Sequence, residues 1–414
     1  MWLDIMKLLI TYNMDTKKFL FTAAAIAAIF GCNKTDNSQN NGGNEEPKPK
    51  PEYADLSLIN YDGTPLTESC TANCYIIRKD GLYSIPLVYG NAIKDGETNV
   101  ESFYTEGIAT DFEDSYGNSF TADSSPYIND HASEQGKSIA SAEVLWNDGA
   151  ASIGNISVTD SELKFEVSDF SACNVLIAVK DNDGTILWSW HLWITDADLT
   201  PVQITNEDGE EFNVMPCNLG WNGWTEDGKP TSPYFQWGRK DPFIANDAPS
   251  SYGNIIFIQL PAESEQAQHI AHQNPKTFYS CLKTKSWTTH TKLNFWDSKM
   301  STCSTHQEVT KTIYDPCPTG WAVPPYNTFT GINKTTITIA DDQKGLFYQK
   351  LYLPICSRRS STDATIPQQI RSYYWLSAPY NDYQSYALTI GPEISSHFYD
   401  FRHYGLSVRP SISR

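Results

Sequence analysis

Acidic side chains that could serve in catalysis are present in this chain, but none stands in a spacing that a known mechanism requires. Hydrolysis of a glycosidic bond needs two carboxyl groups that flank the same bond. The second half offers Asp297, Glu308, Glu393 and Asp400, and nothing marks two of them as partners. The sequence also contains no nucleophile elbow, zinc-protease helix or phosphate-binding loop. We therefore predict a protein that is not an enzyme, and leave action on a polysaccharide as the alternative.

Metal-binding side chains are equally scattered. His269 and His272 would share one face of a helix, but no carboxylate follows them at a ligand spacing. Cys70 and Cys74 lack a second pair at zinc spacing, and His191 is expected to be a half-buried strand histidine. We therefore predict neither a metal site nor a cofactor.

Aromatic side chains offer a different chemistry, because the face of a sugar ring stacks on Trp or Tyr while amides and carboxylates bind its hydroxyl groups. Aromatic residues make up 13% of the chain, with 12 Trp and 23 Tyr, so candidates for stacking are available. Trp375 is expected to be a core residue. The candidate ligand-binding residues are Trp221, Trp224, Tyr373, Tyr374, Asn381 and Asp382.

The composition limits the possible partners. A net charge of −19 repels phosphate backbones, so nucleic-acid binding is disfavoured. Glycine and proline are spread throughout, and long helical periodicity is scarce. These features favour a mostly β class with many turns.

The start of the chain predicts export. Lys17 and Lys18 precede an apolar run that ends at Gly31 and Cys32, which is the order of a secretory signal. The cysteine after a small residue resembles the lipobox of bacterial lipoproteins, where it becomes the lipidated first residue of the mature chain. Residues 1–32 are thus expected to be a lipoprotein signal peptide, with Met14 as the true start.

The next segments are expected to be a tether and a β-sandwich. Residues 33–52 are rich in Asn, Lys and Pro and cannot bury apolar surface, so they predict a flexible tether. Residues 53–200 contain short runs of β character, at residues 73–78, 163–168, 175–180 and 186–195. Asp181 to Gly184 is a turn signal between the last two runs, which predicts an antiparallel hairpin.

Several motifs in order fill the second half, residues 201–414. They are Val214 to Gly220, Tyr234 to Phe243, Ile313 to Pro324 and Tyr404 to Pro410. Together they resemble the Fibrobacter succinogenes major paralogous domain, which is found in surface proteins of Bacteroidota and has a C-type-lectin-like layout. The resemblance implies that its motif residues mostly determine the fold. These are Trp237, Gly238, Arg239, Asp241, Cys317, Trp321, Gly405 and Arg409.

The chain departs from that family at one cysteine. The terminal Val-Arg of the family is followed by cysteine, and here Pro410 stands in its place. Cys317 is then expected to pair with another cysteine, for example Cys356, or to stay free. Eight cysteines remain besides Cys32, and an exported protein would permit disulfides among them. For Arg409 we expect an ion pair with Asp241 or Asp315.

The sequence thus predicts a mostly β, α+β protein: an N-terminal antiparallel β-sandwich followed by a C-type-lectin-like α+β domain. It predicts an outer-membrane lipoprotein, held by its lipid anchor at the cell surface, that acts as a binding or adhesion module for a glycan or a surface protein. A place at a fimbrial tip would fit this role. A structural pilus or envelope subunit, joined by strand donation, is a further alternative.

Overall fold

The structure is a computed structural model. It describes residues 51–107, 112–159, 161–226, 228–245, 255–261, 266–288, 294–299, 308–367, 371–391 and 394–412. These residues belong to one compact unit, Pro51–Arg414. The predicted signal segment, Cys32 and most of the tether lie outside the described residues. Strands account for 40% and helices for 7%, which confirms the mostly β class.

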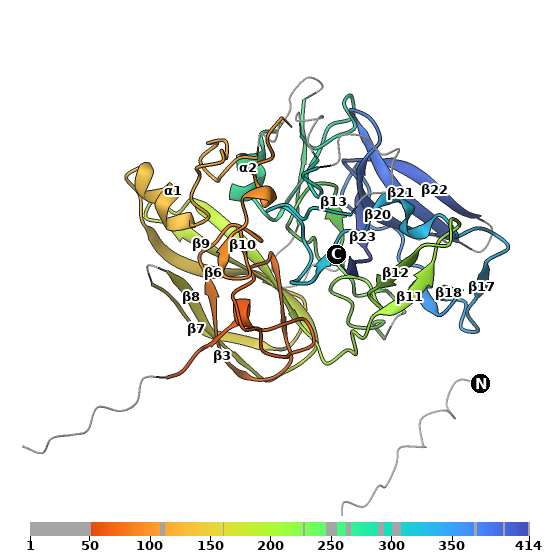
Figure 1. Cartoon of the computed structure of the whole chain (residues 1–414), viewed down its shortest axis with the longest axis horizontal. Helices are drawn as coiled ribbons and strands as arrows, with labels where there is room; N and C mark the ends of the chain where they lie inside the picture. Colours follow the sequence, from red (N-terminus) through yellow and green to blue (C-terminus); the bar gives the residue numbers. More distant parts are fainter. Residues whose placement is uncertain are drawn as a thin grey trace, which may run out of the picture. The chain divides into compact units, whose positions relative to one another are not determined.

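The first half forms two four-stranded sheets that share one hydrophobic core (Figure 1). On β8 the buried residues alternate with partly exposed ones, so one face of that sheet is directed into the core. The first sheet has the order β1 (Ala54–Asp55), β3 (Gly81–Pro86), β8 (Glu162–Ser168) and β7 (Ser152–Val158). The second has the order β2 (Cys74–Ile77), β10 (Ile186–Ile194), β9 (Cys173–Asp181) and β6 (Ile139–Asn147).

The predicted hairpin is confirmed as β9 and β10. The Gly184 amide donates to the Asp181 carbonyl across the turn at 3.0 Å, and Gly184 has a φ of +85°. On β10 the residues from Leu187 to Ile194 are buried on both faces. His191 is therefore fully buried and not half-buried as expected, because residues that follow the hairpin cover the second face.

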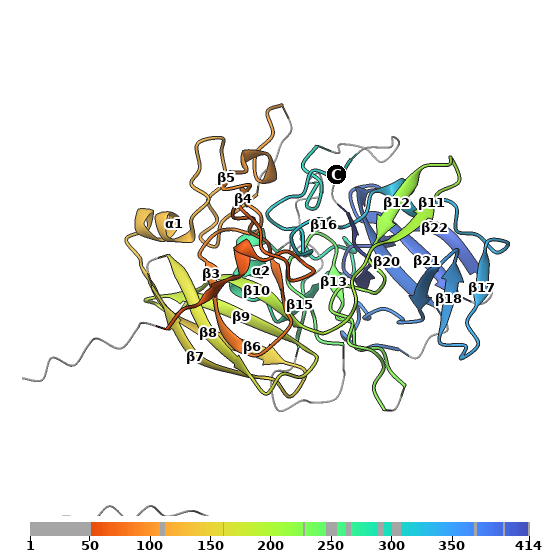
Figure 2. The same cartoon turned by 60° about the horizontal axis from the view of Figure 1, so that its bottom comes forward.

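The second half forms further sheets (Figure 2). A five-stranded sheet has the order β13 (Phe235–Gln236), β23 (Gly405–Val408), β20 (Ser372–Pro379), β21 (Gln384–Gly391) and β22 (Ile394–Phe401). A four-stranded sheet joins β11 (Val202–Thr205), β12 (Glu211–Val214), β24 (Ser411–Ile412) and β16 (Trp321–Ala322). Two small sheets complete this half: β17 (Ile337–Ile339), β18 (Gly345–Tyr348) and β19 (Leu351–Pro354) form one, and β14 (Ile256–Gln259) and β15 (Thr277–Ser280) form the other. The first half also contains a small sheet of β4 (Ile93–Lys94) and β5 (Glu97–Thr98).

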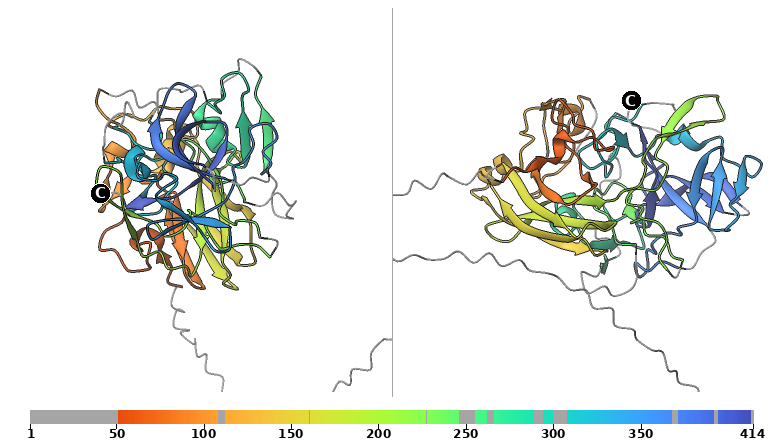
Figure 3. Two further views of the ribbon diagram at one scale, coloured as in Figure 1. Left: turned by 90° about the vertical axis from the view of Figure 1, so that its right-hand side faces the viewer. Right: turned by 90° about the horizontal axis from the view of Figure 1, so that it is seen from below.

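Helices are short. The α-helices are α1 (Ile128–Glu134) and α2 (Gln268–Gln273). The 3₁₀ helices are Leu56–Leu58, Val100–Ser102 and Tyr326–Phe329. Figure 3 shows the whole ribbon from two further directions.

The two halves differ in their sheets but share their main core. Within the described residues, no sheet combines a strand before residue 200 with a strand after it. The main hydrophobic cluster nevertheless contains residues of both halves, such as Trp190 and Trp237. The boundary near residue 200 and the C-type-lectin-like character of the second half remain predictions.

Most motif residues of the second half lie in the interior. Trp237, Trp321 and Arg409 are completely buried, and the Trp237 indole donates to the Leu376 carbonyl at 2.9 Å. Gly238 has a φ of +88°, and a Cβ there would meet the Phe295 ring at 2.5 Å, so only glycine fits. Gly405 is needed for close packing, because a Cβ would approach the Cβ of Arg359 to 2.9 Å.

The motif also contains a buried group of charges. The Lys240 ammonium donates to Asp241 Oδ1 at 2.5 Å and to the Ser189 hydroxyl of β10 at 2.6 Å. Arg239 lies 3.8 Å from Asp241 Oδ2, and its guanidinium donates to the Thr277 carbonyl at 2.6 Å. All three charged side chains are at most 2% exposed. This cluster of Arg239, Lys240 and Asp241 joins the second half to the sheet of the first.

The expected ion pair of Arg409 is wrong. Its guanidinium donates to Asn218 Oδ1 from Nε at 2.9 Å and from Nη2 at 2.6 Å. Asp241 is paired with Lys240, and Asp315 accepts hydrogen bonds from the backbone amides of Cys317 and Val323. A neutral amide therefore satisfies Arg409, because both carboxylates are occupied by neighbours in their own loops.

The bridge considered between Cys317 and Cys356 is absent. Both carry free thiols and are buried. The Cys356 thiol accepts from the Asn218 amide at 3.3 Å, and burial raises its pKa to about 12. These thiols are un-ionised core groups, so they would be poor nucleophiles. Cys303 lies outside the described residues.

Candidate functional site

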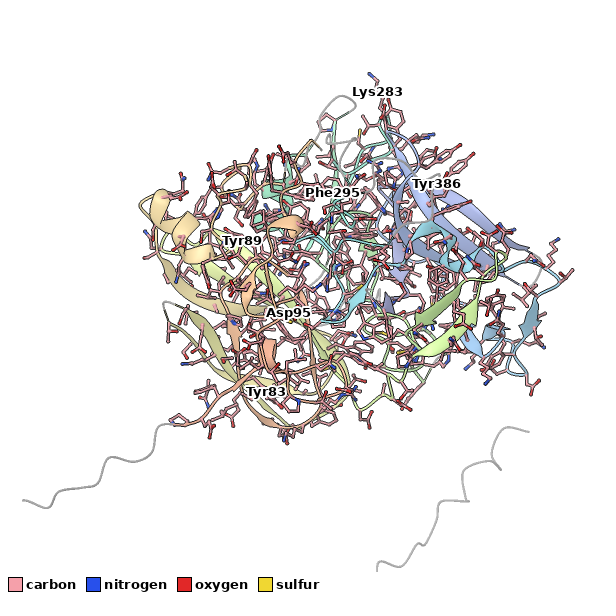
Figure 4. All side chains as sticks on the ribbon, in the orientation of Figure 1. Tyr83, Tyr89, Asp95, Lys283, Phe295 and Tyr386 are labelled. Carbon is pink, nitrogen blue, oxygen red and sulfur yellow. The ribbon has the colours of Figure 1, made fainter. Side chains whose placement is uncertain are left out.

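Four tyrosine rings gather where the five-stranded sheet reaches the surface. We call Tyr326, Tyr380, Tyr386 and Tyr399 the tyrosine patch. Tyr380 stacks on Tyr399, with ring centres 4.1 Å apart and planes 3° apart. Tyr386 meets the edge of Tyr380 at 5.2 Å and that of Tyr326 at 4.4 Å. Figure 4 labels Tyr386 on the blue ribbon of this sheet.

The pattern of β21 explains why the rings are at the surface. Tyr386, Leu388 and Ile390 alternate onto one face of the strand, and the last two are completely buried in a second core with β18 and β19. Tyr386 continues the same face to the rim of that core, where it is only partly buried. Tyr399 is its cross-strand partner on β22. Tyr386 thus lies at the edge of the second core, opposite Tyr399.

A tight turn between β20 and β21 presents the most exposed part of the site. Asn381 Oδ1 accepts hydrogen bonds from the backbone amides of Tyr383 and Gln384, both at 2.9 Å. Its side-chain amide donates to Gln384 Oε1 at 2.8 Å. Asn381 therefore holds the turn together. Tyr380 is 42% exposed and Tyr383 is 48% exposed, on either side of the exposed Asp382.

A buried arginine supports the turn from below. Arg402 donates from Nη2 to the Asn381 carbonyl at 2.7 Å and from Nε to the Ser385 hydroxyl at 3.0 Å. Its guanidinium lies 4.5 Å from the centre of the Trp237 ring. Burial lowers the pKa of Arg402 to about 9, and the charge of Asp382 opposes this shift. The turn is therefore fixed by the interior and not only by its own hydrogen bonds.

This arrangement suits the binding of a polar ring with one apolar face. The exposed side chains of Tyr380 and Tyr383 offer apolar surface, and Asp382, which is also exposed and lies between them in the sequence, has a carboxylate that can accept hydrogen bonds from hydroxyl groups.

Among the predicted ligand-binding residues, the structure brings Asn381 and Asp382 to this site and places Trp221 and Trp224 in another group. The two indole rings meet edge to face at 5.2 Å, and both are partly exposed. The Lys344 ammonium lies 5.4 Å from the centre of the Trp224 ring. They form a second, smaller aromatic surface.

The remaining predicted aromatic residues serve the interior. Tyr374 is completely buried, and its hydroxyl donates to the Pro354 carbonyl at 2.7 Å. Tyr373 is 8% exposed and packs against the Arg358 guanidinium at 4.7 Å. Trp375 is completely buried, as expected, and donates to the Phe235 carbonyl. Neither Tyr373 nor Tyr374 presents a ring face to a ligand.

The candidate histidines have separate partners. His269 lies 2.8 Å from Glu113, whereas His272 is buried against Trp188 and Tyr314. His191 lies 2.9 Å from Asn174 Oδ1, and burial lowers its pKa to about 3, so it is neutral. Within the ranges that the structure describes, no three His, Cys, Asp or Glu side chains are grouped as a metal site would require.

The candidate carboxylates also lie in different surroundings. Asp400 forms an ion pair with Arg358. Asp297 is completely buried and accepts a hydrogen bond from the backbone amide of Thr310. Glu308 is exposed, and Glu393 lies outside the described residues. Burial raises the pKa of Asp297 to about 6, and its Oδ2 has no hydrogen-bond partner. Asp297 is thus a buried acid whose surroundings favour its protonated form.

We expect Asp297 to make stability depend on pH. Its carboxyl binds a proton more tightly in the folded chain than in the unfolded chain, so wild-type stability should rise as pH falls through about 6. Asp297→Asn removes the buried charge, so its free energy of unfolding should exceed that of wild type by the largest amount at pH 8. Its advantage over wild type should shrink by about 1 kcal/mol between pH 8 and pH 5. Urea unfolding of both proteins across this range measures the effect, and parallel pH profiles would contradict it.

The tyrosine patch was not predicted from the sequence. The available signal was the pair of tyrosines that brackets Asn381 and Asp382, since a polar turn between two strands places its neighbours at the surface. Tyr386 and Tyr399 gave no such signal, because their exposure depends on where the second core ends.

No helix of the described residues is long and apolar enough to cross a bilayer. Comparison of the chain with family models, with curated proteins and with solved structures finds no match in any of the three.

Proposed function

We propose that this protein is an exported lipoprotein that binds glycans through the tyrosine patch and the turn beside it. The observation that carries the proposal is the exposed turn in which Tyr380 and Tyr383 flank the exposed Asp382 along the chain. Aromatic rings bordered by hydrogen-bonding groups suit the two kinds of surface on a pyranose.

The net charge of the chain favours neutral over anionic ligands. A net charge of −19 disfavours polyanions, and the turn of the site itself carries the negative charge of Asp382. We therefore propose neutral glycans as ligands. The signal segment that ends at Cys32 supports an anchor in the outer membrane, and the tether after it would hold the binding domain away from the lipid surface. The resemblance of residues 201–414 to a domain of surface proteins is consistent with this role.

A binding screen tests the proposal. The full chain, solubilised in detergent, is applied to an array of neutral and anionic glycans together with host and bacterial surface proteins. We expect binding to neutral glycans, with weak salt dependence because stacking involves no net charge. Failure to bind any glycan would overturn the proposal, and preference for anionic glycans would overturn the ligand class.

A further inference from the structure

A buried histidine of α1 fastens the loop that precedes this helix. His131 is 6% exposed, and its Nδ1 lies 2.8 Å from Asp114 Oδ2. Its Nε2 lies 2.9 Å from the carbonyl oxygen of Ser125. We call these three residues the His131 clasp. The clasp holds the chain from residue 114 onward against α1, which is labelled in Figure 1.

Both contacts of the ring need a hydrogen on the histidine, because carboxylate and carbonyl oxygens only accept hydrogen bonds. A neutral imidazole carries one N–H, so the two contacts together require the doubly protonated, positively charged ring. Asp114 is ionised, because its oxygens also accept from the backbone amides of Tyr116 and Asn118 and from the Asn118 side chain. The clasp is therefore a buried ion pair with an additional hydrogen bond that depends on the same proton.

The other titratable groups around the ring are compatible with its positive charge. Glu134 of α1 adds negative charge, and Asp130 of α1 accepts from the hydroxyl of the clasp serine. The ring centres of Tyr89 and Phe120 each lie 5.0 Å from that of the imidazole. Tyr89, labelled in Figure 4, is neutral because burial raises its pKa well above the ordinary value.

The charge of His131 stabilises the clasp over a definite pH range. Burial by itself would lower the pKa of His131, but the hydrogen bonds to Asp114 and to the Ser125 carbonyl outweigh it and raise the pKa above its ordinary value of 6.5. The stabilisation is complete below about pH 6.5 and is lost as pH rises through the pKa of the folded chain. Burial opposes ionisation of Asp114 too, but its hydrogen bonds lower its pKa, so it stays charged throughout this range.

The loop held by the clasp also contacts the second half of the chain. Glu113 accepts from the backbone amide of His269 on α2 at 3.0 Å and lies 2.8 Å from the Nδ1 of the same residue. Gln273 of α2 donates to the Ser115 carbonyl at 2.6 Å. Because these contacts start from residues on either side of the clasp aspartate, loosening of the loop would weaken a junction between the two halves.

We propose that the His131 clasp is a pH-sensitive device, which holds residues 112–134 closed while its histidine is charged and loosens them as pH rises. Loss of the ring proton leaves one ring nitrogen as an acceptor that faces another acceptor, which is unfavourable in the interior. The loop then opens more often, and its contacts with α2 open with it. This device is independent of glycan binding at the tyrosine patch.

Hydrogen exchange followed by mass spectrometry tests the proposal on the full chain in detergent. Exchange of the imidazole C2 hydrogen measures the pKa of His131, and amide exchange measures the protection of residues 112–134 between pH 5 and pH 9. We compare wild type with His131→Gln, so that the pH effects of other groups, such as Asp297, cancel in the ratio of their protection factors. This ratio should fall at least about threefold from pH 5 to pH 9. Linkage requires a tenfold fall for each unit by which the measured pKa of His131 exceeds 6.5, so the two measurements check each other.

Two further variants complete the test. Glu134→Gln changes an exposed acid on the same helix that forms no hydrogen bond with the ring, so its ratio to wild type should stay nearly constant. Asp114→Asn removes the negative partner and should lower the measured pKa of His131, a result that does not depend on whether His131→Gln folds. A wild-type pKa of His131 at or below 6.5, an unchanged pKa in Asp114→Asn, or a constant ratio for His131→Gln would overturn the proposal.

Discussion

Asp241→Ala should destabilise the protein by about 3–5 kcal/mol, because it leaves the buried charges of Lys240 and Arg239 without their counter-ion. The Asp241 carboxylate also accepts from the Ser189 hydroxyl at 2.6 Å, so the change disrupts the junction between β10 and the second half. Chemical denaturation at pH 7 measures the loss.

Two further variants serve as comparisons for the destabilisation by Asp241→Ala. Asp241→Asn keeps an oxygen acceptor and loses only the charge, so its effect should be smaller. Asp183→Ala breaks an exposed ion pair with Lys137. The Asp183 side chain is 55% exposed and the Lys137 side chain is 31% exposed, so the free energy of unfolding should fall by less than about 1 kcal/mol. If Asp241→Ala unfolds as easily as Asp183→Ala does, the buried cluster does not contribute as we argue.

Burial lowers the pKa of Lys240 to about 8, and Asp241 opposes that shift. Without Asp241 the ammonium should lose its proton at a still lower pH. Lys240 is charged in the unfolded chain up to its ordinary pKa near 10.4. Its release of a proton in the folded variant should therefore make the penalty shrink as pH rises toward about 8. Above that pH the penalty should stay constant, because wild-type Lys240 then releases its proton as well. A penalty that does not change between about pH 6 and pH 8 would contradict the assignment to an unpaired buried cation.

Cys32→Ala should transfer the protein from the membrane fraction to the soluble fraction. The expected anchor consists of acyl chains on this residue, and each buried methylene contributes about 0.8 kcal/mol to membrane binding. Fractionation of cells, followed by intact-mass analysis, measures both the location and the lipid. Cys70→Ala is the matched control, because Cys70 lies in the described domain and should leave the anchor intact. An unacylated wild-type chain that retains Met14 would contradict the lipoprotein proposal.

The regular elements of the first half could be predicted because their signals are local. The β9–β10 hairpin follows from two apolar runs around Asp181 and Gly184, and the structure confirms it. Such signals depend on a few neighbouring residues, so a single sequence contains them.

The partners of buried polar groups could not be predicted, because they depend on how distant segments meet. Asp241 pairs with its neighbour Lys240 and with Ser189 of the first half, and no pattern in the sequence links residues 189 and 241. His191 is buried for a similar reason, since its strand is covered on both faces. The candidate site shows the same limit, because Tyr386 is a site residue only where the second core ends.

The central claim is that the exposed rings of Tyr380 and Tyr383 bind glycans, and one comparison tests it most directly. The affinity of the full chain for its best neutral glycan is measured for wild type, Tyr380→Ala and Tyr127→Ala. Tyr127 is 49% exposed and Tyr380 is 42% exposed, so the two substitutions remove similar surface. We predict that Tyr380→Ala weakens binding at least tenfold, or about 1.4 kcal/mol, with an unchanged unfolding midpoint, and that Tyr127→Ala has no effect. Equal affinities for all three proteins would contradict the claim.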